Sequence, residues 1–182
     1  IYTSTVRDVA EKYGYEPIRY LMISSHYRSP INYSVDIIDQ CKASLTRLHT
    51  CRDSLDFALK NAGDGEPENA AEIRAQMEAR KQQFIEAMDD DLNTADALAA
   101  VFELVRDINV SVLQSGSKAL ITDAIKLFDE LTDVLGIVYP HEQADDLDAE
   151  VEKMIEARQA ARKAKNWAEA DRIRDELKEK GI

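Results

Sequence analysis

Apolar residues recur along most of this chain at spacings of three and four, the period of an α-helix with one buried face. The clearest stretch predicts a helix over 94–113, and others predict helices over 18–25, 35–59, 70–88 and 117–135. No segment shows a convincing alternation of period two, so no strands are expected. The pattern therefore predicts an all-α chain built around an antiparallel helical bundle.

Local signals place the helix ends. Thr5, followed three residues later by Asp8, has the pattern of a capping box and begins a short first helix, which ends before Gly14. Pro17 suits the first position of the second helix. Gly136 ends the last helix of the bundle. Residues that favour the N-cap position begin the other helices of 35–135, notably Ser34, Thr94 and Ser117.

The last part of the chain predicts a small separate hairpin of two helices. Residues 139–149 contain a proline and several acids and are expected to form a linker. A first helical arm is predicted over 149–165. Asn166 and Glu169 have the spacing of a capping box for a second arm, which ends before Gly181.

Composition agrees with long helices and excludes several classes of protein. The 182 residues include only 6 Gly and 4 Pro, too few for a turn-rich β domain. No apolar run approaches the length of a membrane-spanning helix, and no secretory signal is visible. Cys41 and Cys51 are expected to be reduced structural thiols in a cytoplasmic protein. Because the chain starts at Ile1 rather than Met, we expect a piece of a longer protein.

The sequence predicts neither a metal site nor a nucleotide site in this chain. Cys41 and Cys51, ten residues apart on one helix, are expected to point to different faces. No pair of histidine and acid or histidine and histidine has metal-binding spacing, so a metal-dependent bundle enzyme lacks its ligands. The acids at 89–91 are expected to form a solvated turn before a helix. The Gly63-Asp64-Gly65 segment lacks the third glycine of a nucleotide-binding loop.

Charge is distributed unevenly along the chain, whose formal net charge is −12. Residues 1–150 carry 14 Lys and Arg against 28 Asp and Glu, whereas residues 151–182 carry 9 against 7. An acidic body does not fit general binding to nucleic acid, so any such contact is expected near the basic tail. In that tail, Arg158, Arg162 and Lys165 form one basic stripe along the first arm.

The single tryptophan lies on the second arm of the predicted hairpin. Trp167 flanks the apolar face of that arm and lies beside Asp171 and Arg174. One interpretation is that Trp167 covers the small core of the hairpin. The other is a base-reading surface, in which the indole stacks on a base and the carboxylate accepts base N–H groups. The pattern of residues leaves both open.

Residues 26–34 are also unusual, because aromatic, basic and hydroxyl side chains alternate before a helix start. One interpretation is a packed aromatic corner with a helix cap. The other is a ledge on which Arg28, tyrosine and serine donors position a phosphate chain.

Three separated segments together resemble the cysteinyl-tRNA synthetase family, in order and across essentially the whole chain. They are His26-Tyr27-Arg28-Ser29-Pro30-Ile31-Asn32-Tyr33-Ser34, Asp91-Leu92-Asn93-Thr94-Ala95-Asp96-Ala97-Leu98, and Arg158-x-x-x-Arg162-Lys163-x-Lys165-Asn166-Trp167-x-x-Ala170-Asp171-x-Ile173-Arg174. The resemblance is to the C-terminal part of a bacterial-type enzyme, after its KMSKS loop. The chain departs from the family after Gly181-Ile182, where members usually continue with a short acidic segment.

The resemblance implies a division of the chain and a set of contact residues. Residues 1–34 resemble a stem-contact segment, 35–138 a DALR-type helical bundle, and 150–182 the start of an anticodon-binding domain, with 139–149 as the linker. The residues whose positions in the motif imply anticodon contacts are Arg162, Trp167 and Asp171. The candidate contacts to the tRNA backbone are Arg28, Arg158, Lys163 and Lys165.

The resemblance also implies an activity for the full-length enzyme. Members join cysteine to its tRNA through a cysteinyl-adenylate made from ATP, and their catalytic domain and zinc ligands would lie upstream of residue 1. The present chain is therefore expected to hold cysteine tRNA and read its anticodon, to carry no cofactor and no catalytic residue, and to be inactive alone. Cysteine tRNA is the expected partner, with neither DNA nor a membrane.

Two alternatives stay open. A related ligase joins cysteine to an amino-sugar inositol and shares the catalytic domain and bundle, but it reads no anticodon, so the cluster of Arg162, Trp167 and Asp171 argues against it. A helical protein-interaction module could use the rod predicted over 35–59, whose heptad pattern fits an intramolecular bundle equally well.

Overall fold

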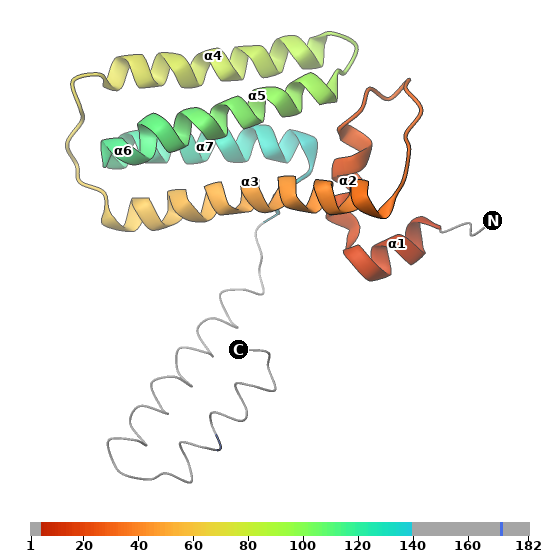
Figure 1. Cartoon of the computed structure of the whole chain (residues 1–182). Helices are drawn as coiled ribbons and strands as arrows, with labels where there is room; N and C mark the ends of the chain where they lie inside the picture. Colours follow the sequence, from red (N-terminus) through yellow and green to blue (C-terminus); the bar gives the residue numbers. More distant parts are fainter. Residues whose placement is uncertain (1–4, 140–171, 173–182) are drawn as a thin grey trace. The chain divides into compact units, whose positions relative to one another are not determined.

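The computed structural model describes residues 5–139 and Arg172 (Figure 1). Contacts along the backbone divide the chain into two compact units, Ile1–Tyr139 and Pro140–Ile182. The described part consists of helices joined by loops, and its only β pairing is an isolated bridge between Gly63 and Ser117. The prediction of an all-α chain is therefore confirmed for the described residues. The predicted hairpin lies outside them, except for Arg172, which is helical and exposed.

The first helix begins at its predicted cap, and the second begins two residues before its predicted start. Helix α1 (Val6–Tyr13) begins with the predicted capping box, in which Thr5 N–H donates to Asp8 at 2.8 Å and Asp8 N–H donates to Thr5 Oγ1 at 3.3 Å. Helix α2 (Tyr15–Ile23) starts earlier than predicted, so Pro17 lies inside the first turn rather than at its first position. The first turn tolerates proline because its N–H groups have no partner within the helix.

Helix α3 (Val35–Asn61) is the longest of the described helices, and Ser34 caps it by accepting from Ile37 N–H at 3.2 Å. The prediction that Cys41 and Cys51 point to different faces is wrong, because both are buried in the same core. Ten residues correspond to an angular offset of only about 80°, which one broad buried face accommodates. Burial raises the pKa of both thiols, to about 11 for Cys51.

Helices α4 (Ala70–Asp89) and α5 (Thr94–Asp107) form an antiparallel pair. The N-cap of α5 is Asn93 rather than the predicted Thr94, because Asn93 Oδ1 accepts from Asp96 N–H at 3.2 Å. The helix predicted over 94–113 is also interrupted. It passes into the π-helical segment η1 (Ile108–Val112) and the short α6 (Leu113–Ser115). Ile108 and Val112, the first and last residues of the π-helical segment, are both fully buried.

Helix α7 (Lys118–Leu135) completes the bundle, and most of its apolar residues are buried. The helical period of 117–135 predicts that Val134 points inward, and this is wrong because Val134 is 56% exposed. Ile85 on α4, also apolar, is 38% exposed. Leu135 and Phe84, their neighbours in sequence, occupy the buried positions instead. Ser117 precedes α7 as predicted, but its side chain makes no capping hydrogen bond.

Figure 1 shows α3, α4, α5 and α7 lying side by side as a bundle, with α1 and α2 at one end of α3. The largest fully buried side chains come from α3, α5, η1 and α7, with Phe128 of α7 among them. None of the described helices is both long and apolar enough to cross a membrane. At the end of the bundle near α2, the loop that leads to α3 approaches the turn between α4 and α5.

Candidate nucleic-acid interface

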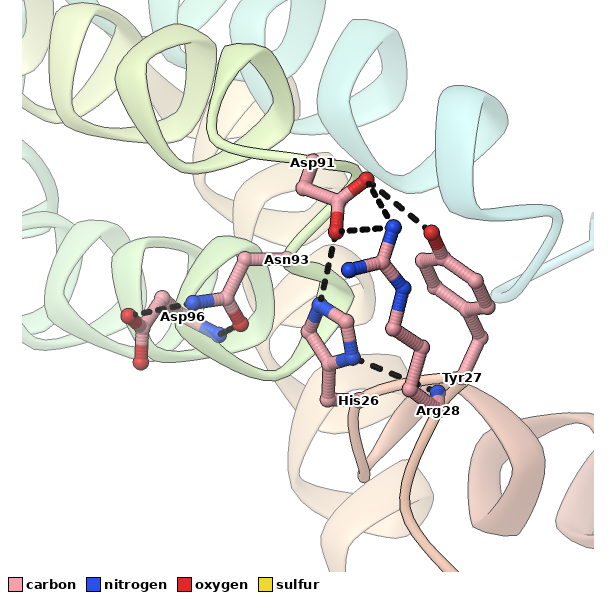
Figure 2. Close-up of polar contacts among 6 residues, drawn as sticks. All are labelled: His26, Tyr27, Arg28, Asp91, Asn93 and Asp96. Carbon is pink, nitrogen blue, oxygen red and sulfur yellow. Dashed lines mark hydrogen bonds and ion pairs between the residues drawn. The ribbon is translucent and has the colours of Figure 1, made fainter.

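Two turns that are far apart in the sequence meet at this end of the bundle (Figure 2). The Asp91 carboxylate accepts hydrogen bonds from the Tyr27 hydroxyl at 2.9 Å and from Arg28 Nη2, whose nearer contact is 3.1 Å. His26 Nε2 lies 3.8 Å from the same carboxylate. We call His26, Tyr27, Arg28 and Asp91 the corner. Three donors from the α2–α3 loop thus converge on one acid from the α4–α5 turn.

Local hydrogen bonds shape the loop that supplies the three donors. Ser24 Oγ donates to the Leu21 carbonyl at 2.8 Å at the end of α2, and Ser29 N–H donates to the His26 carbonyl at 2.8 Å. Arg28 N–H donates to His26 Nδ1 at 3.3 Å, while the other ring nitrogen, Nε2, faces Asp91. Pro30 then favours the extended backbone that reaches α3.

The α4–α5 turn has an uncommon backbone. Asp91 and Leu92 both adopt left-handed conformations, with φ of 56° and 55°, which residues other than glycine rarely do. Beyond them, Asn93 and Asp96 form two hydrogen bonds that start α5, at 3.2 Å and 2.8 Å. This pair fixes one end of the turn, and Leu92 N–H, bonded to the Met88 carbonyl, fixes the other. This backbone conformation of the α4–α5 turn directs the Asp91 carboxylate toward the α2–α3 loop (Figure 2).

The aromatic rings of the corner pack on each other. His26 and Tyr27 are stacked, with centroids 4.7 Å apart and planes inclined by 26°. The Arg28 guanidinium carbon lies 5.3 Å from the Tyr27 ring centroid, within the range of a cation–π contact. The hydrogen bond to Asp91 raises the pKa of Tyr27, and the Arg28 hydrogen bond opposes that rise in part. The Tyr27 hydroxyl therefore keeps its proton at neutral pH and remains a donor.

The corner has the chemistry of an anion contact rather than of a catalytic site. The Arg28 side chain is 68% exposed. Among the described residues Asp91 is its single carboxylate partner, and the hydrogen bond to that carboxylate comes from Nη2. The other N–H groups of the guanidinium can bind an external oxyanion such as a phosphate. The structure shows the packed aromatic corner of the first interpretation, and the role of Arg28 in positioning a phosphate chain stays a prediction.

The role of Asp91 was missed by the sequence interpretation. The prediction of a solvated turn at 89–91 is confirmed in that all three acids are exposed, but it did not anticipate that the Asp91 carboxylate joins two segments of the bundle. Asp91 lies 64 positions from Tyr27, so no helical period or local motif connects them. Residues 26–34 and 91–98 were both among the segments that carry the family resemblance, which was the only signal that connected them.

The remaining predicted site residues lie outside the described residues: Arg158, Arg162, Lys163, Lys165, Trp167 and Asp171. Within 5–139 and at 172, no three His, Cys, Asp or Glu side chains are grouped as metal ligands. Cys41 and Cys51 are buried, and burial raises the pKa of both thiols, which disfavours the thiolate that zinc requires. The described residues therefore do not fit the zinc that the resemblance implies for the full-length enzyme.

Comparison with known proteins finds two domain families in this chain, one in the bundle and one in the C-terminal part. Residues 83–139 match the DALR domain family, and residues 144–182 match the family described as the cysteinyl-tRNA ligase anticodon binding domain. The chain is 44% identical over 178 residues to the cysteine--tRNA ligase of Caldicellulosiruptor saccharolyticus. That alignment covers 97% of this chain and 38% of the relative, so the chain spans well under half of the relative's length. With both domains in this order and similarity along nearly its whole length, the chain belongs to the cysteinyl-tRNA synthetase family and corresponds to its C-terminal part.

Proposed function

We propose that this chain is the tRNA-binding part of a cysteine--tRNA ligase. It binds cysteine tRNA in the cytoplasm and reads its anticodon, while the ATP-dependent joining of cysteine to the tRNA takes place in the rest of the full-length enzyme. The match of residues 144–182 to an anticodon binding domain carries this proposal. The 44% identity to a cysteine--tRNA ligase supports the choice of tRNA.

The anticodon contacts are assigned to three residues within the matched segment. Trp167 supplies a flat apolar face on which a base can stack. The Asp171 carboxylate accepts N–H groups of a base edge, and the Arg162 guanidinium donates to a base edge or a phosphate. These three side-chain types can together recognise an unstacked base, which is how proteins read single-stranded RNA loops.

Contacts to the RNA backbone are assigned to cations on both compact units. In the bundle, Arg28 is exposed and has N–H donors to spare at the corner. In the matched tail, Arg158, Lys163 and Lys165 belong to the basic segment that precedes Trp167. Such contacts position the RNA and supply affinity without selecting its sequence.

The chemistry of activation is assigned to the remainder of the enzyme. ATP and zinc are what the resemblance implies for the full-length enzyme, and among the described residues no three metal-ligating side chains are grouped. We therefore expect the purified chain to show no cysteine-dependent exchange of pyrophosphate into ATP. Exchange above background would contradict this division of labour. The related inositol ligase is disfavoured, because the chain matches an anticodon binding domain.

The test of the proposed function is binding to cysteine tRNA and to transcripts with altered anticodons. Asp171→Ala should cost roughly 1–3 kcal/mol of binding free energy and relax the choice at one anticodon base. Trp167→Ala should weaken binding by roughly 1–3 kcal/mol through loss of stacking. Lys163→Ala should weaken all tRNAs alike and lower the salt dependence by about one charge.

Two controls make this test decisive. Each variant's helicity and melting are compared with wild type first, because Trp167 could also stabilise the hairpin. Glu176→Ala then serves as the matched acid outside the motif, and it should leave discrimination unchanged. A folded Asp171→Ala protein that discriminates anticodons as well as wild type does would refute the assignment.

A further inference from the structure

Two lysines from different helices meet at one tyrosine ring beside the start of α3. Lys12 Nζ lies 4.9 Å from the centroid of the Tyr13 ring on α1, and Lys42 Nζ from α3 lies 5.6 Å from the same centroid. Both distances are within the range of a cation–π contact. Tyr33, in the loop that leads to α3, lies near enough to affect the titration of Lys12. We call Lys12, Tyr13, Tyr33 and Lys42 the lysine cluster.

The positive charge of the lysine cluster is only partly balanced. Within the described part of the chain, neither Lys12 nor Lys42 forms an ion pair with an acid. The Tyr13 hydroxyl raises the pKa of Lys12, chiefly through a hydrogen bond, and Asp39 adds a smaller electrostatic contribution. Lys12 therefore stays protonated at neutral pH beside a second ammonium group. Two like charges that share one ring repel each other, and an oxyanion bound between them offsets that repulsion.

The lysine cluster is open to solvent and shares a loop with the corner. Lys12 and Lys42 are exposed, and so is every residue of 27–33. Five steps along the sequence separate Arg28 of the corner from Tyr33, which allows at most about 18 Å between their backbones. Arg28 and the lysine cluster therefore present hydrogen-bond donors at the two ends of one short, exposed loop within the unit Ile1–Tyr139.

We propose that the lysine cluster is a second contact for the phosphate backbone of the bound RNA, next to the contact assigned to Arg28. Lysine ammonium groups bind phosphate as point charges, and the Tyr33 hydroxyl can donate a further hydrogen bond. Such contacts position an RNA and add affinity without selecting its sequence. This inference rests on the proposed function, because it takes the bound anion to be the backbone of a tRNA. The affinity that the lysine cluster adds is then independent of the anticodon.

The experiment titrates the full chain with a cysteine tRNA transcript at several salt concentrations. Lys42→Met is compared with Lys60→Met, which removes the same charge from an exposed position in the last turn of the same helix. We expect Lys42→Met to weaken binding by roughly threefold to tenfold and to make the slope of log affinity against log salt shallower by about 0.7–0.9. Lys60→Met should leave both quantities nearly unchanged. Lys12→Met should behave like Lys42→Met, and neither should alter discrimination between anticodon variants.

The outcomes separate this inference from the proposed function. A wild-type chain that does not bind cysteine tRNA overturns the proposed function and the inference with it. Wild-type binding combined with equal effects of Lys42→Met and Lys60→Met overturns the lysine cluster alone, because charge then acts without regard to its position. Lys42→Arg, which retains the positive charge, should bind nearly as well as wild type. A loss in Lys42→Arg as large as that in Lys42→Met would contradict a phosphate contact and indicate a structural role.

Discussion

The corner and the arginine ion pairs elsewhere in the same bundle have opposite ratios of hydrogen-bond donors to acceptors. In the bundle, each of three arginines contacts two carboxylates, a set that we call the ladder: Arg52 with Asp56 and Asp129, Arg74 with Glu66 and Asp123, and Arg80 with Glu103 and Asp107. In the corner, three donors share the single carboxylate of Asp91. Acceptors are in excess in the ladder, and donors are in excess in the corner.

This difference teaches where an acidic protein can bind an anion. Residues 51–139 carry 8 Lys and Arg against 18 Asp and Glu, whereas residues 5–50 carry 6 against 5. A phosphate brought to the ladder would meet arginines already shared between acids, and their carboxylates would repel it. At the corner it would meet exposed N–H donors. The local ratio of donors to acceptors, rather than the net charge of the chain, therefore supports the corner as the proposed anion contact.

The comparison assumes that the corner and the ladder belong to one hydrophobic core that unfolds cooperatively. Phe128 on α7 is fully buried, so Phe128→Ala should lower the free energy of unfolding by about 3–5 kcal/mol. Urea unfolding followed by circular dichroism and by tyrosine fluorescence should give one coincident transition. Val134→Ala on the same helix, where the side chain is 56% exposed, is the control and should change stability little. Separate transitions would show two independent parts.

Loss of a ladder arginine should destabilise the protein more than loss of the corner arginine. Arg80→Met leaves Asp107, whose side chain is 18% exposed, without the guanidinium that donates to it at 2.8 Å. We expect a loss of about 1–2 kcal/mol, because a half-buried charge loses its partner. Arg28→Met should cost under about 0.5 kcal/mol, since the Arg28 side chain is mostly exposed. If urea unfolding showed equal losses of unfolding free energy for Arg80→Met and Arg28→Met, the ladder and the corner would not differ in their contribution to stability.

When binding to tRNA is measured, loss of the corner arginine should cost more than loss of a ladder arginine, which is the reverse of the order for stability. Arg28→Met should weaken binding by about 1 kcal/mol and lower the slope of affinity against salt by about one charge. Arg74→Met, which changes the net charge equally, should leave both quantities nearly unchanged because its guanidinium is shared between Glu66 and Asp123. Titrations at several salt concentrations measure both. If Arg74→Met lowered the slope as much as Arg28→Met, net charge rather than donor excess would explain binding.

The smallest expected effect concerns Asp91 and the titration of Tyr27. The hydrogen bond to Asp91 raises the pKa of Tyr27 above its unfolded value. That hydrogen bond therefore stabilises the fold fully below the pKa of an unfolded tyrosine and is lost as pH rises through the folded value. Asp91→Asn should lower the pKa of Tyr27, measured by phenolate absorbance with Tyr27→Phe identifying the group. An unchanged titration would show that Asp91 does not hold the corner.

Much of the fold could be predicted from the sequence because its signals are local. Thr5 with Asp8, Ser34 and Gly136 mark helix ends through contacts within one turn, and the structure has those ends. Where two adjacent residues compete for one role, the pattern cannot choose. Asn93 and Thr94 are both good caps, and the one whose side chain reaches Asp96 N–H caps the helix.

What escaped prediction depends on contacts between distant segments. Helical period places Val134 on the inward side, but the position of its neighbours in the bundle leaves it exposed. The π-helical turn at 108–112 also follows from packing, because no residue type there demands it. At the candidate site, Arg28 was identified from its unusual neighbours. Its partner Asp91 was not, since only the folded bundle brings the two turns together.

The corner has a further consequence for the order of folding events. Helices α4 and α5 are joined by only the four residues 90–93, so their pairing closes a short loop and is kinetically favoured. The contact of Tyr27 with Asp91 spans 64 positions and must await the bundle. Interactions that form after the rate-limiting step govern unfolding rather than folding rates, so Asp91→Asn should speed unfolding and leave the folding rate almost unchanged. The segment proposed to hold RNA would then be the last part of the body to assemble and the first to come apart.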